Sequence, residues 1–301
     1  MTIKESISLL RLRTLPLSAS GVILGSLLAA ADYIIRPIVP VFVLLTALGL
    51  QIVSNISNDI GDFRNGVVSS RDDNNFVSLS EGQVTEKEIK ALLKIWIAIT
   101  VINGLLMIYL SFGTLFCLES FILMILGFFA ISAAMKYTLG RNPYGYRGLG
   151  DIYVFIFFGL VSVLGAYFVC SHSFGTWITT LPAAAIGCFS VAVLNVNNIR
   201  DIESDKGTRL TLAIRLGEKN AKIYQTILIC AGWLCLLSFV FMRVFDLWHF
   251  LFVLTLPLYV LHLRIVWKNS GKALDKGLPL LVMSTFLLSI LFGLGFVVFL
   301  L

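Results

Sequence analysis

Uncharged, mainly apolar stretches alternate with short charged segments along the whole chain. A helix needs about 20 apolar residues to cross a bilayer. The stretches without Asp, Glu, Lys or Arg are 14–31, 37–58, 95–118, 120–135, 152–199, 223–242, 247–263 and 277–301. The stretch 152–199 is long enough for two helices, with a turn at 171–175. The pattern predicts an all-α, polytopic membrane protein with nine transmembrane helices in a single domain, 1–301, in which short stretches are completed by flanking residues.

Basic residues are concentrated on one side of these predicted helices. If successive helices alternate in direction, every Lys and Arg except Arg36 and Arg243 falls on the side of the N-terminus. Cytoplasmic loops of membrane proteins are enriched in Lys and Arg. We therefore predict a cytoplasmic N-terminus and a C-terminus outside. A cleaved signal peptide at 14–31 is the alternative, because this stretch follows basic residues and ends in alanines, but it is long for a signal.

The composition agrees with a lipid environment and excludes several functions. Apolar residues make up 58% of the chain and charged residues 13%, whereas soluble domains have roughly a half and a quarter. The formal charge of +6 then reflects cytoplasmic loops rather than nucleic-acid binding. Five cysteines without a CxxC pair and three scattered histidines argue against a disulfide framework and against a zinc or haem site.

Two clusters of Asn and Asp interrupt the apolar pattern at the predicted ends of the second and sixth helices. Spacings of three and four residues place the side chains of each cluster on one face of a helix. The first cluster contains Asn55, Asp59 and Asp62, and the second contains Asn197, Asp201 and Asp205. Four helices separate the two acidic loops, which suggests two four-helix repeats, about 1–140 and 141–265, followed by a ninth helix at about 277–301.

If the clusters face each other across a bundle, their carboxylates share one pocket. Like charges at that range resist ionisation unless a cation neutralises them. Mg²⁺ prefers oxygen ligands, retains waters and is commonly shared with substrate phosphates. We therefore predict a Mg²⁺–diphosphate site formed by the carboxylates, with Asn55 and Asn197 as neutral oxygen ligands. Inert, solvated residues at helix ends are the alternative, although polar groups at membrane depth are costly and usually functional.

Basic residues of the same loops are candidates for binding the diphosphate. Guanidinium groups match phosphate oxygens in charge and geometry. The enrichment of basic residues in cytoplasmic loops explains several of them without any such role. The residues that we favour are Arg64, Lys136, Arg147 and Arg200, with Arg141 and Arg209 ranked below them.

At these positions the chain resembles the UbiA superfamily of intramembrane prenyltransferases, and more narrowly its 1,4-dihydroxy-2-naphthoate branch. Residues 58–62 match the first family motif, 197–205 match the second, and 211–217 match the stretch that usually follows. The segments 136–138, 146–151 and 154–159 resemble the naphthoate branch rather than the 4-hydroxybenzoate branch. An acidic residue that relatives often carry after the first motif is replaced by Val68, and Asp72 or Asp73 is a potential substitute.

The resemblance implies transfer of a polyprenyl group from polyprenyl diphosphate to 1,4-dihydroxy-2-naphthoate. CO₂ and diphosphate would be lost, giving demethylmenaquinone in a bacterial cell membrane. Mg²⁺ would act as a Lewis acid on the leaving diphosphate, and Lys136 and Arg147 would stabilise the same charge. Arg13 or Arg147 would pair with the acceptor carboxylate, and Asp151 would orient its hydroxyl. The other substrate-binding residues implied are Asn58, Tyr137, Tyr146 and Asn198, with the tyrosine rings facing the allylic cation.

Two alternatives remain open. A prenyltransferase of this kind can instead act on 4-hydroxybenzoate, homogentisate or another phenol. A transporter also uses paired polar sites within repeats, but it places them near the bilayer midplane, whereas these clusters lie at helix ends. The sequence does not fix the length of the prenyl chain or the oligomeric state.

Overall fold

The computed structural model describes residues 2–64, 84–141, 143–243 and 246–298, and this part of the chain contains helices and no strand. The spanning segments are α2 (Leu15–Asp32), α3 (Ile38–Arg64), α4 (Glu86–Phe112), α5 (Leu118–Lys136), α6 (Gly150–Val154) with η4 (Phe155–Val161) and α7 (Ser162–Ser171), η5 (Trp177–Thr179) with α8 (Thr180–Arg200), α10 (Leu212–Phe241), η6 (Leu247–Thr255) with α11 (Leu256–Lys268), and η7 (Gly271–Lys276) with α12 (Gly277–Val298). The remaining short helices are α1 (Ile3–Leu9), η1 (Leu12–Thr14), η3 (Tyr144–Arg147) and α9 (Ile202–Asp205).

The number of spans agrees with the sequence pattern. Within the described ranges, nine helical segments are long and apolar enough to cross a membrane, which confirms the nine-span prediction. The long stretch 152–199 divides as expected, because α7 ends at Ser171 and η5 begins at Trp177. The first span packs through α2 against α7 and α12, so this segment is part of the bundle rather than an appendage.

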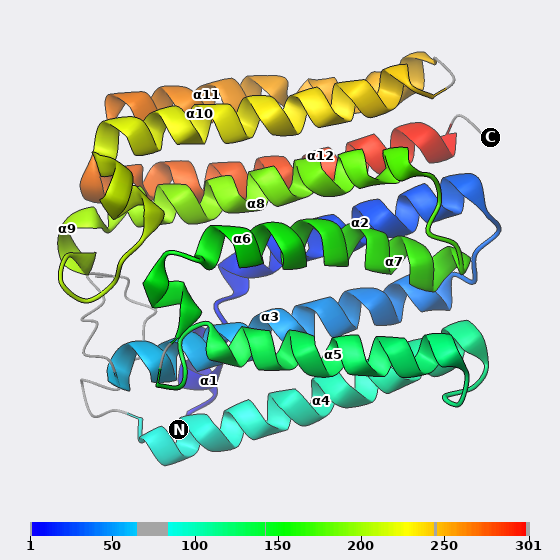
Figure 1. Cartoon of the computed structure of the whole chain (residues 1–301), viewed down its shortest axis with the longest axis horizontal. Coiled ribbons are helices and arrows are strands. Elements are labelled where there is room, and N and C mark those ends of the chain that lie inside the picture. Colours follow the sequence, from blue (N-terminus) through cyan, green and yellow to red (C-terminus); the bar gives the residue numbers. More distant parts are fainter. Residues whose placement is uncertain (1, 65–83, 142, 244–245, 299–301) are drawn as a thin grey trace.

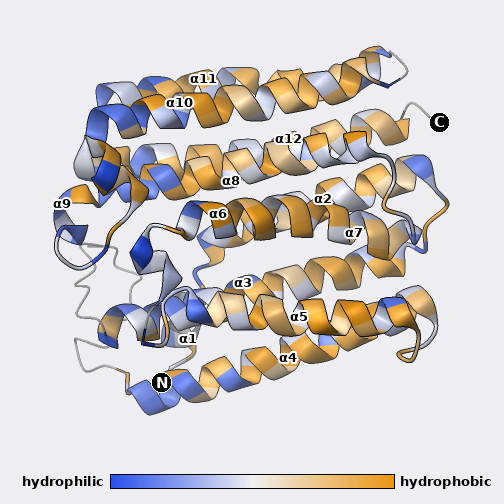
Figure 2. Ribbon diagram, viewed as in Figure 1, coloured by the Kyte–Doolittle hydropathy of each residue, from blue (hydrophilic) through white to orange (hydrophobic). Residues whose placement is uncertain are grey.

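The spanning helices lie side by side in one bundle (Figure 1). Figure 2 shows hydrophilic residues gathered at the end of the bundle that carries α9 and the starts of α4 and α10, whereas the middle of each helix is hydrophobic. Large apolar side chains such as Phe128 and Ile227 are exposed along the helices. Such exposure is expected where lipid is the solvent.

Local sequence signals set the ends of several helices. At the start of α4, the Thr85 hydroxyl accepts from the Glu88 N–H (3.3 Å), and the Glu88 carboxylate accepts from the Thr85 N–H (2.9 Å). This reciprocal cap satisfies two backbone donors that the first turn leaves open. The same helix ends at Gly113, whose φ of 73° favours glycine.

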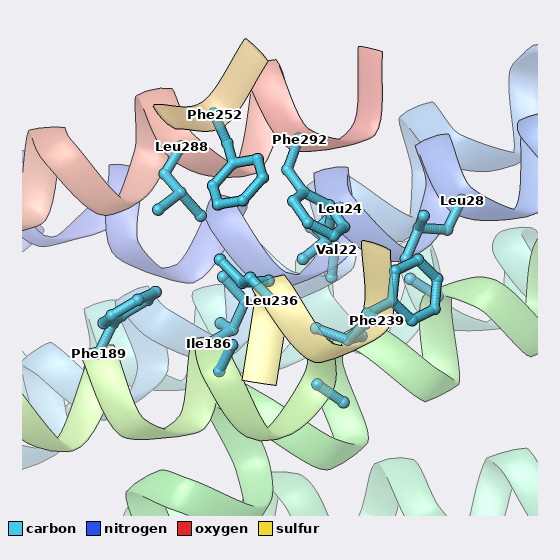
Figure 3. Packing of buried hydrophobic residues seen from close by; sticks show 14 of the residues in the cluster. Val22, Leu24, Leu28, Ile186, Phe189, Leu236, Phe239, Phe252, Leu288 and Phe292 are labelled. Atoms are coloured by element: carbon cyan, nitrogen blue, oxygen red, sulfur yellow. The ribbon is translucent and has the colours of Figure 1, made fainter. Parts of the chain in front are cut away.

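The main hydrophobic core lies among α2, α7, α8, α10 and α12. Figure 3 shows Leu24, Ile186 and Phe292 from three of these helices meeting there. Because lipid is as apolar as these side chains, close packing rather than the hydrophobic effect holds membrane helices together. Gly25 makes this possible between α2 and α7, since an added Cβ would lie 2.2 Å from the Val163 carbonyl oxygen.

A π-helical segment, η4, interrupts the fifth span between α6 and α7. Wide turns of this type occur frequently at functional sites. Its Gly159 packs directly on Gly187 of α8, where an added Cβ would lie 2.6 Å from the Gly187 Cα. Phe157, Phe158 and Val161 of the same segment line a large cavity.

A chain of buried polar side chains connects α8, α10, α11 and the start of α12. Asn195 Nδ2 donates to Gln225 Oε1 (2.8 Å) and to the Ala221 carbonyl oxygen (2.9 Å). Gln225 Nε2 lies 3.0 Å from His262 Nε2, and His262 Nδ1 lies 3.0 Å from the Gly277 carbonyl oxygen. Because a carbonyl only accepts, His262 Nδ1 carries the proton and Nε2 accepts from the Gln225 amide. The network fixes the start of α12 relative to α8.

The opposite end of the bundle carries its own ion pair. Arg243 pairs with Asp32, whose second oxygen accepts from the Tyr167 hydroxyl (2.7 Å). The Arg243 guanidinium also lies 5.3 Å from the ring centres of Phe239 and Phe296. These contacts hold together the ends of α2, α7, α10 and α12.

Candidate active site

A cavity of about 1970 Å³ begins at the polar end of the bundle and extends between α3, α5, η4, α7 and α8. Its polar end is lined by residues of both Asn/Asp clusters and by several arginines, and its other walls are mainly apolar. The charged and polar residues that matter here are Arg11, Arg13, Asn55, Asn58, Asp59, Asp62, Tyr137, Asn197, Asn198, Arg200, Arg209 and Asp275.

The last turns of α3 present the two carboxylates of the first cluster to this cavity. Asp59 is buried and pairs with Arg11 of the N-terminal segment. Asp62 is also buried, and its Oδ1 accepts from the Tyr146 hydroxyl (2.6 Å) and from Arg209 Nη2 (2.6 Å). Both carboxylates are therefore held by a guanidinium group that comes from a distant part of the chain.

Asn55, predicted as a metal ligand, fixes the N-terminal segment on α3. Its Nδ2 donates to the Leu10 carbonyl oxygen (2.8 Å) and to the Thr14 hydroxyl (3.0 Å), while its Oδ1 accepts from Gln51 Nε2 (2.9 Å). These bonds hold η1 against α3 and thereby set the position of Arg11. In this arrangement both ends of the Asn55 amide are engaged by protein.

The second cluster is organised around Arg200, the last residue of α8. The Arg200 guanidinium donates to both oxygens of Asp201 (2.7 and 2.6 Å), to Asn197 Oδ1 (2.8 Å) and to Asp275 Oδ1 (2.7 Å). Asp275 lies in η7, immediately before α12. Arg200, Asn197 and Asp275 line the cavity, whereas Asp201 does not.

The two clusters meet through Arg209. Its Nη2 lies 2.6 Å from Asp62 Oδ1, and its Nε lies 3.8 Å from Asp205 Oδ1. One guanidinium group therefore spans the acidic ends of α3 and α9. Burial lowers the pKa of Arg209, but the charges of Asp62 and Asp205 raise it and outweigh burial, so the group stays cationic.

Aromatic and amide side chains complete the polar end of the cavity. Asn58 accepts from the Thr138 hydroxyl (3.1 Å), and Asn198 is buried on the cavity wall. Burial raises the pKa of Tyr137 to about 12, so its hydroxyl stays neutral and can donate a hydrogen bond. Tyr144 and Tyr153 stack with ring centres 3.8 Å apart on the same wall.

Several predicted residues lie away from the cavity. Arg64 is exposed and pairs with Glu86 at the start of α4. Lys136 and Arg147 are also exposed and do not line the cavity. Asp151 is buried in α6, outside the cavity. Tyr146 and Asp205 are likewise not on its surface, but they contact it through Asp62 and Arg209. The segment with Val68, Asp72 and Asp73 lies outside the described residues.

Two residues of this site were not predicted from the sequence. Arg11 was attributed to the basic side of the membrane, and nothing in its spacing connects it to Asp59. Asp275 is a single acid in the loop before the last span. The only usable signal was its proximity to a predicted cytoplasmic helix end. Arg209 was ranked low, although it lies four residues after Asp205 and therefore on the same side of a helical turn.

The donor set of this site suits Mg²⁺. It offers carboxylate and amide oxygens, the ligands that Mg²⁺ prefers, beside cations that suit a diphosphate. Among the described residues, however, no three acidic, His or Cys side chains are already arranged around one point. Arg11, Arg200 and Arg209 hold carboxylates instead. Binding of a metal would therefore require these guanidinium groups to turn away from the acids.

Comparisons with known proteins show the family and the fold. The model of the UbiA prenyltransferase family matches residues 19–290. A 1,4-dihydroxy-2-naphthoate octaprenyltransferase of Escherichia coli K12 is 38% identical over 288 residues, which cover 95% of this chain and 92% of that protein. The apo structure of a UbiA homolog from Aeropyrum pernix K1 has a TM-score of 0.70 at 19% identity and covers 100% of both chains. A UbiA homolog from Archaeoglobus fulgidus bound to GPP and Mg²⁺ has a TM-score of 0.64 at 15% identity, covering 98% of this chain and 99% of that one.

Proposed function

The chain belongs to the UbiA prenyltransferase family, and we propose that it transfers a polyprenyl group from polyprenyl diphosphate to 1,4-dihydroxy-2-naphthoate. The relative from E. coli carries this acceptor in its name and matches almost the whole chain. The observation that carries the proposal is the meeting of two Asn/Asp clusters at the polar end of an otherwise apolar cavity, where Arg209 spans Asp62 and Asp205. An anionic head group with a long apolar tail matches such a cavity.

The reaction begins with departure of diphosphate from the allylic carbon. Asp59, Asp62, Asp201 and Asp205 would hold Mg²⁺, and the bound ion would supply Lewis-acid stabilisation of the leaving group. Arg11 and Arg209 add positive charge at the same end of the cavity. Each of them pairs with a carboxylate in the structure and would become available to the diphosphate if a metal took over that carboxylate.

The aromatic acceptor then attacks the allylic carbon. A new carbon–carbon bond forms between the allylic carbon and the ring carbon that carries the carboxylate. The bond from that ring carbon to the carboxylate then breaks, CO₂ leaves, and the electron pair of the broken bond restores the aromatic ring. Arg13 lines the cavity near the acids and is suited to pair with the acceptor carboxylate. The face of Tyr137 is suited to stabilise positive charge on the allylic group.

Substitution of one carboxylate from each cluster tests the proposal. Asp59→Asn and Asp201→Asn should each lower turnover at least about 100-fold, because a charged ligand becomes neutral with little change in shape. Glu203→Gln is the matched control, since its side chain is 84% exposed in the same acidic loop. The assay offers purified protein in detergent a prenyl diphosphate with 1,4-dihydroxy-2-naphthoate or 4-hydroxybenzoate. Full activity of either Asp variant, or full activity in excess chelator, would refute the metal site.

The orientation in the membrane follows from the distribution of basic residues. The hydrophilic end of the bundle (Figure 2), where the Asn/Asp clusters line the cavity, faces the cytoplasm in this proposal, because almost every Lys and Arg lies on that side. Alkaline phosphatase fused after residue 301 should then be active in intact cells, because that enzyme matures only outside the cytoplasm. A fluorescent protein fused at the same point should stay dark. The opposite pair of results contradicts the orientation.

A further inference from the structure

The apolar part of the cavity follows two spanning segments across most of the bundle. On α5 its wall runs from Tyr137 at the polar end to Leu123, and on the fifth span it runs from Tyr153 to Val169. At about 1.5 Å per residue these stretches measure about 21 Å and about 24 Å. The hydrocarbon core of a bilayer is about 30 Å thick. The cavity therefore extends far beyond the space that a diphosphate and an aromatic acid need.

Two helical glycines in this apolar part have open space where a side chain would be. A Cβ added to Gly127 of α5 or to Gly165 of α7 would meet no atom within 4 Å, and both residues line the cavity. Other helical glycines of the bundle, such as Gly25 and Gly159, would place that Cβ within 3 Å of a neighbouring helix. Helix packing thus explains those glycines, but it does not explain Gly127 and Gly165.

The conformation of the backbone does not explain them either. Neither residue has a positive φ, so a larger residue fits the local backbone. Glycine in the interior of a helix is less favourable than alanine by about 0.5–1 kcal/mol. The effect of glycine at these two positions is therefore to keep the cavity open.

The two glycines also lie at matching positions along the cavity. Gly127 is one helical turn from Leu123, and Gly165 is one turn from Val169, where the lining of each helix ends. Counted from the polar end, Gly127 lies about 15 Å from Tyr137, and Gly165 lies about 18 Å from Tyr153. A ligand must pass both glycines to fill the last turn of the cavity.

From this placement we infer that Gly127 and Gly165 determine the length of isoprenoid that the protein accepts. This inference rests on the proposed function, because it takes the diphosphate end of the donor to bind at the acidic clusters. The distal units of a long tail then pass between the two bare backbones into the last turn. Short tails end before this point and have no contact with either glycine.

Side chains of increasing size at both positions test the inference. Gly127→Leu and Gly165→Leu should lower kcat/KM for an octaprenyl diphosphate at least about 10-fold relative to kcat/KM for geranyl diphosphate. A steric change of one methylene in an apolar pocket already has an effect of about this size. The measured quantity is the donor ratio, kcat/KM for octaprenyl diphosphate divided by kcat/KM for geranyl diphosphate. Because both values come from the same variant, a general loss of activity cancels in the ratio. Alanine at the same positions should change the ratio in the same direction by a smaller factor.

A bulky substitution on the lipid-facing side of α5 is the matched control. Ile125→Phe adds volume two residues from Gly127, at a side chain that is 43% exposed and does not line the cavity. It should leave the donor ratio unchanged. If a leucine variant does not fold, as judged by gel filtration in detergent, the alanine variants decide the question.

The outcomes separate this inference from the proposed function. A donor ratio that stays at the wild-type value in all four glycine variants overturns the inference, because the tail then leaves the bundle by another route. Wild-type protein that prenylates no aromatic acid with either donor overturns the proposed function instead. A ratio that shifts toward the short donor with increasing side-chain size supports the assignment.

Discussion

Replacement of Arg209 by methionine should make the thermal stability of the protein strongly dependent on Mg²⁺. The Arg209 guanidinium lies between Asp62 and Asp205, whose residues are only 8% and 6% exposed. Removal of one partner from a buried ion pair costs about 3–5 kcal/mol, because the remaining charge stays buried. At about 2 °C per kcal/mol for a chain of this size, the melting temperature without metal should fall by about 6–10 °C.

A divalent cation should reverse this loss in the variant. Mg²⁺ can occupy the position that the guanidinium leaves, and a ligand that binds only the folded state stabilises it according to its affinity. We therefore expect Mg²⁺ to raise the melting temperature of Arg209→Met by several degrees more than that of the wild type. Turnover should nevertheless fall about 100-fold or more, because a cation beside the diphosphate is lost.

Thermal unfolding in detergent across a Mg²⁺ titration measures this difference. Lys206→Met is the matched control, since Lys206 is a cation of the same loop whose side chain is 56% exposed and pairs with the exposed Glu203. Exposed pairs contribute little to stability, so this variant should follow the wild type. Equal Mg²⁺ stabilisation of Arg209→Met and wild type would show that the metal does not bind at Asp62 and Asp205.

Two further substitutions test how the site is held. Asn55→Leu removes the hydrogen bonds to Leu10 and Thr14 that position η1. It should lower the free energy of unfolding by about 1–3 kcal/mol and also lower turnover. Unchanged turnover in the purified variant would show that catalysis does not need the position of η1. Gly159→Ala places a Cβ 2.6 Å from the Gly187 backbone and should destabilise the protein by about 1–3 kcal/mol in thermal unfolding. Gly165→Ala should not destabilise the protein, because its added Cβ would meet no atom within 4 Å. Similar losses of thermal stability in the two alanine variants would contradict the packing argument.

The spanning helices and the two acidic clusters could be predicted because each depends on local periodicity. Uncharged length, together with the turn at 171–175, predicted the nine spans, and the i, i+4 spacing of Asn197 and Asp201 placed them on one face of a helix. The proposed duplication into two four-helix repeats stays a prediction.

The partners of the acids could not be predicted, because tertiary structure determines them. Arg64 follows Asp62 by only two residues and therefore points to another side of α3, where it finds Glu86. Arg64 does not line the cavity, and its role in binding the diphosphate stays a prediction. Arg11, by contrast, is 48 residues from Asp59 and reaches it only because Asn55 fixes the N-terminal segment on α3.

The few charged residues at the opposite end of the bundle bear on the orientation of the protein in an energised membrane. That face carries Arg36 and Arg243 against Asp32, Glu119 and Asp246, a net charge of −1 from two cations and three anions. Each elementary charge that crosses a potential of 100 mV changes the energy by about 2.3 kcal/mol. In the proposed orientation, an outer face that is slightly negative and an inner face that is strongly positive both lower the electrical energy when the cell interior is negative. The resting potential of the cell would thus favour the same orientation that the loops select during insertion.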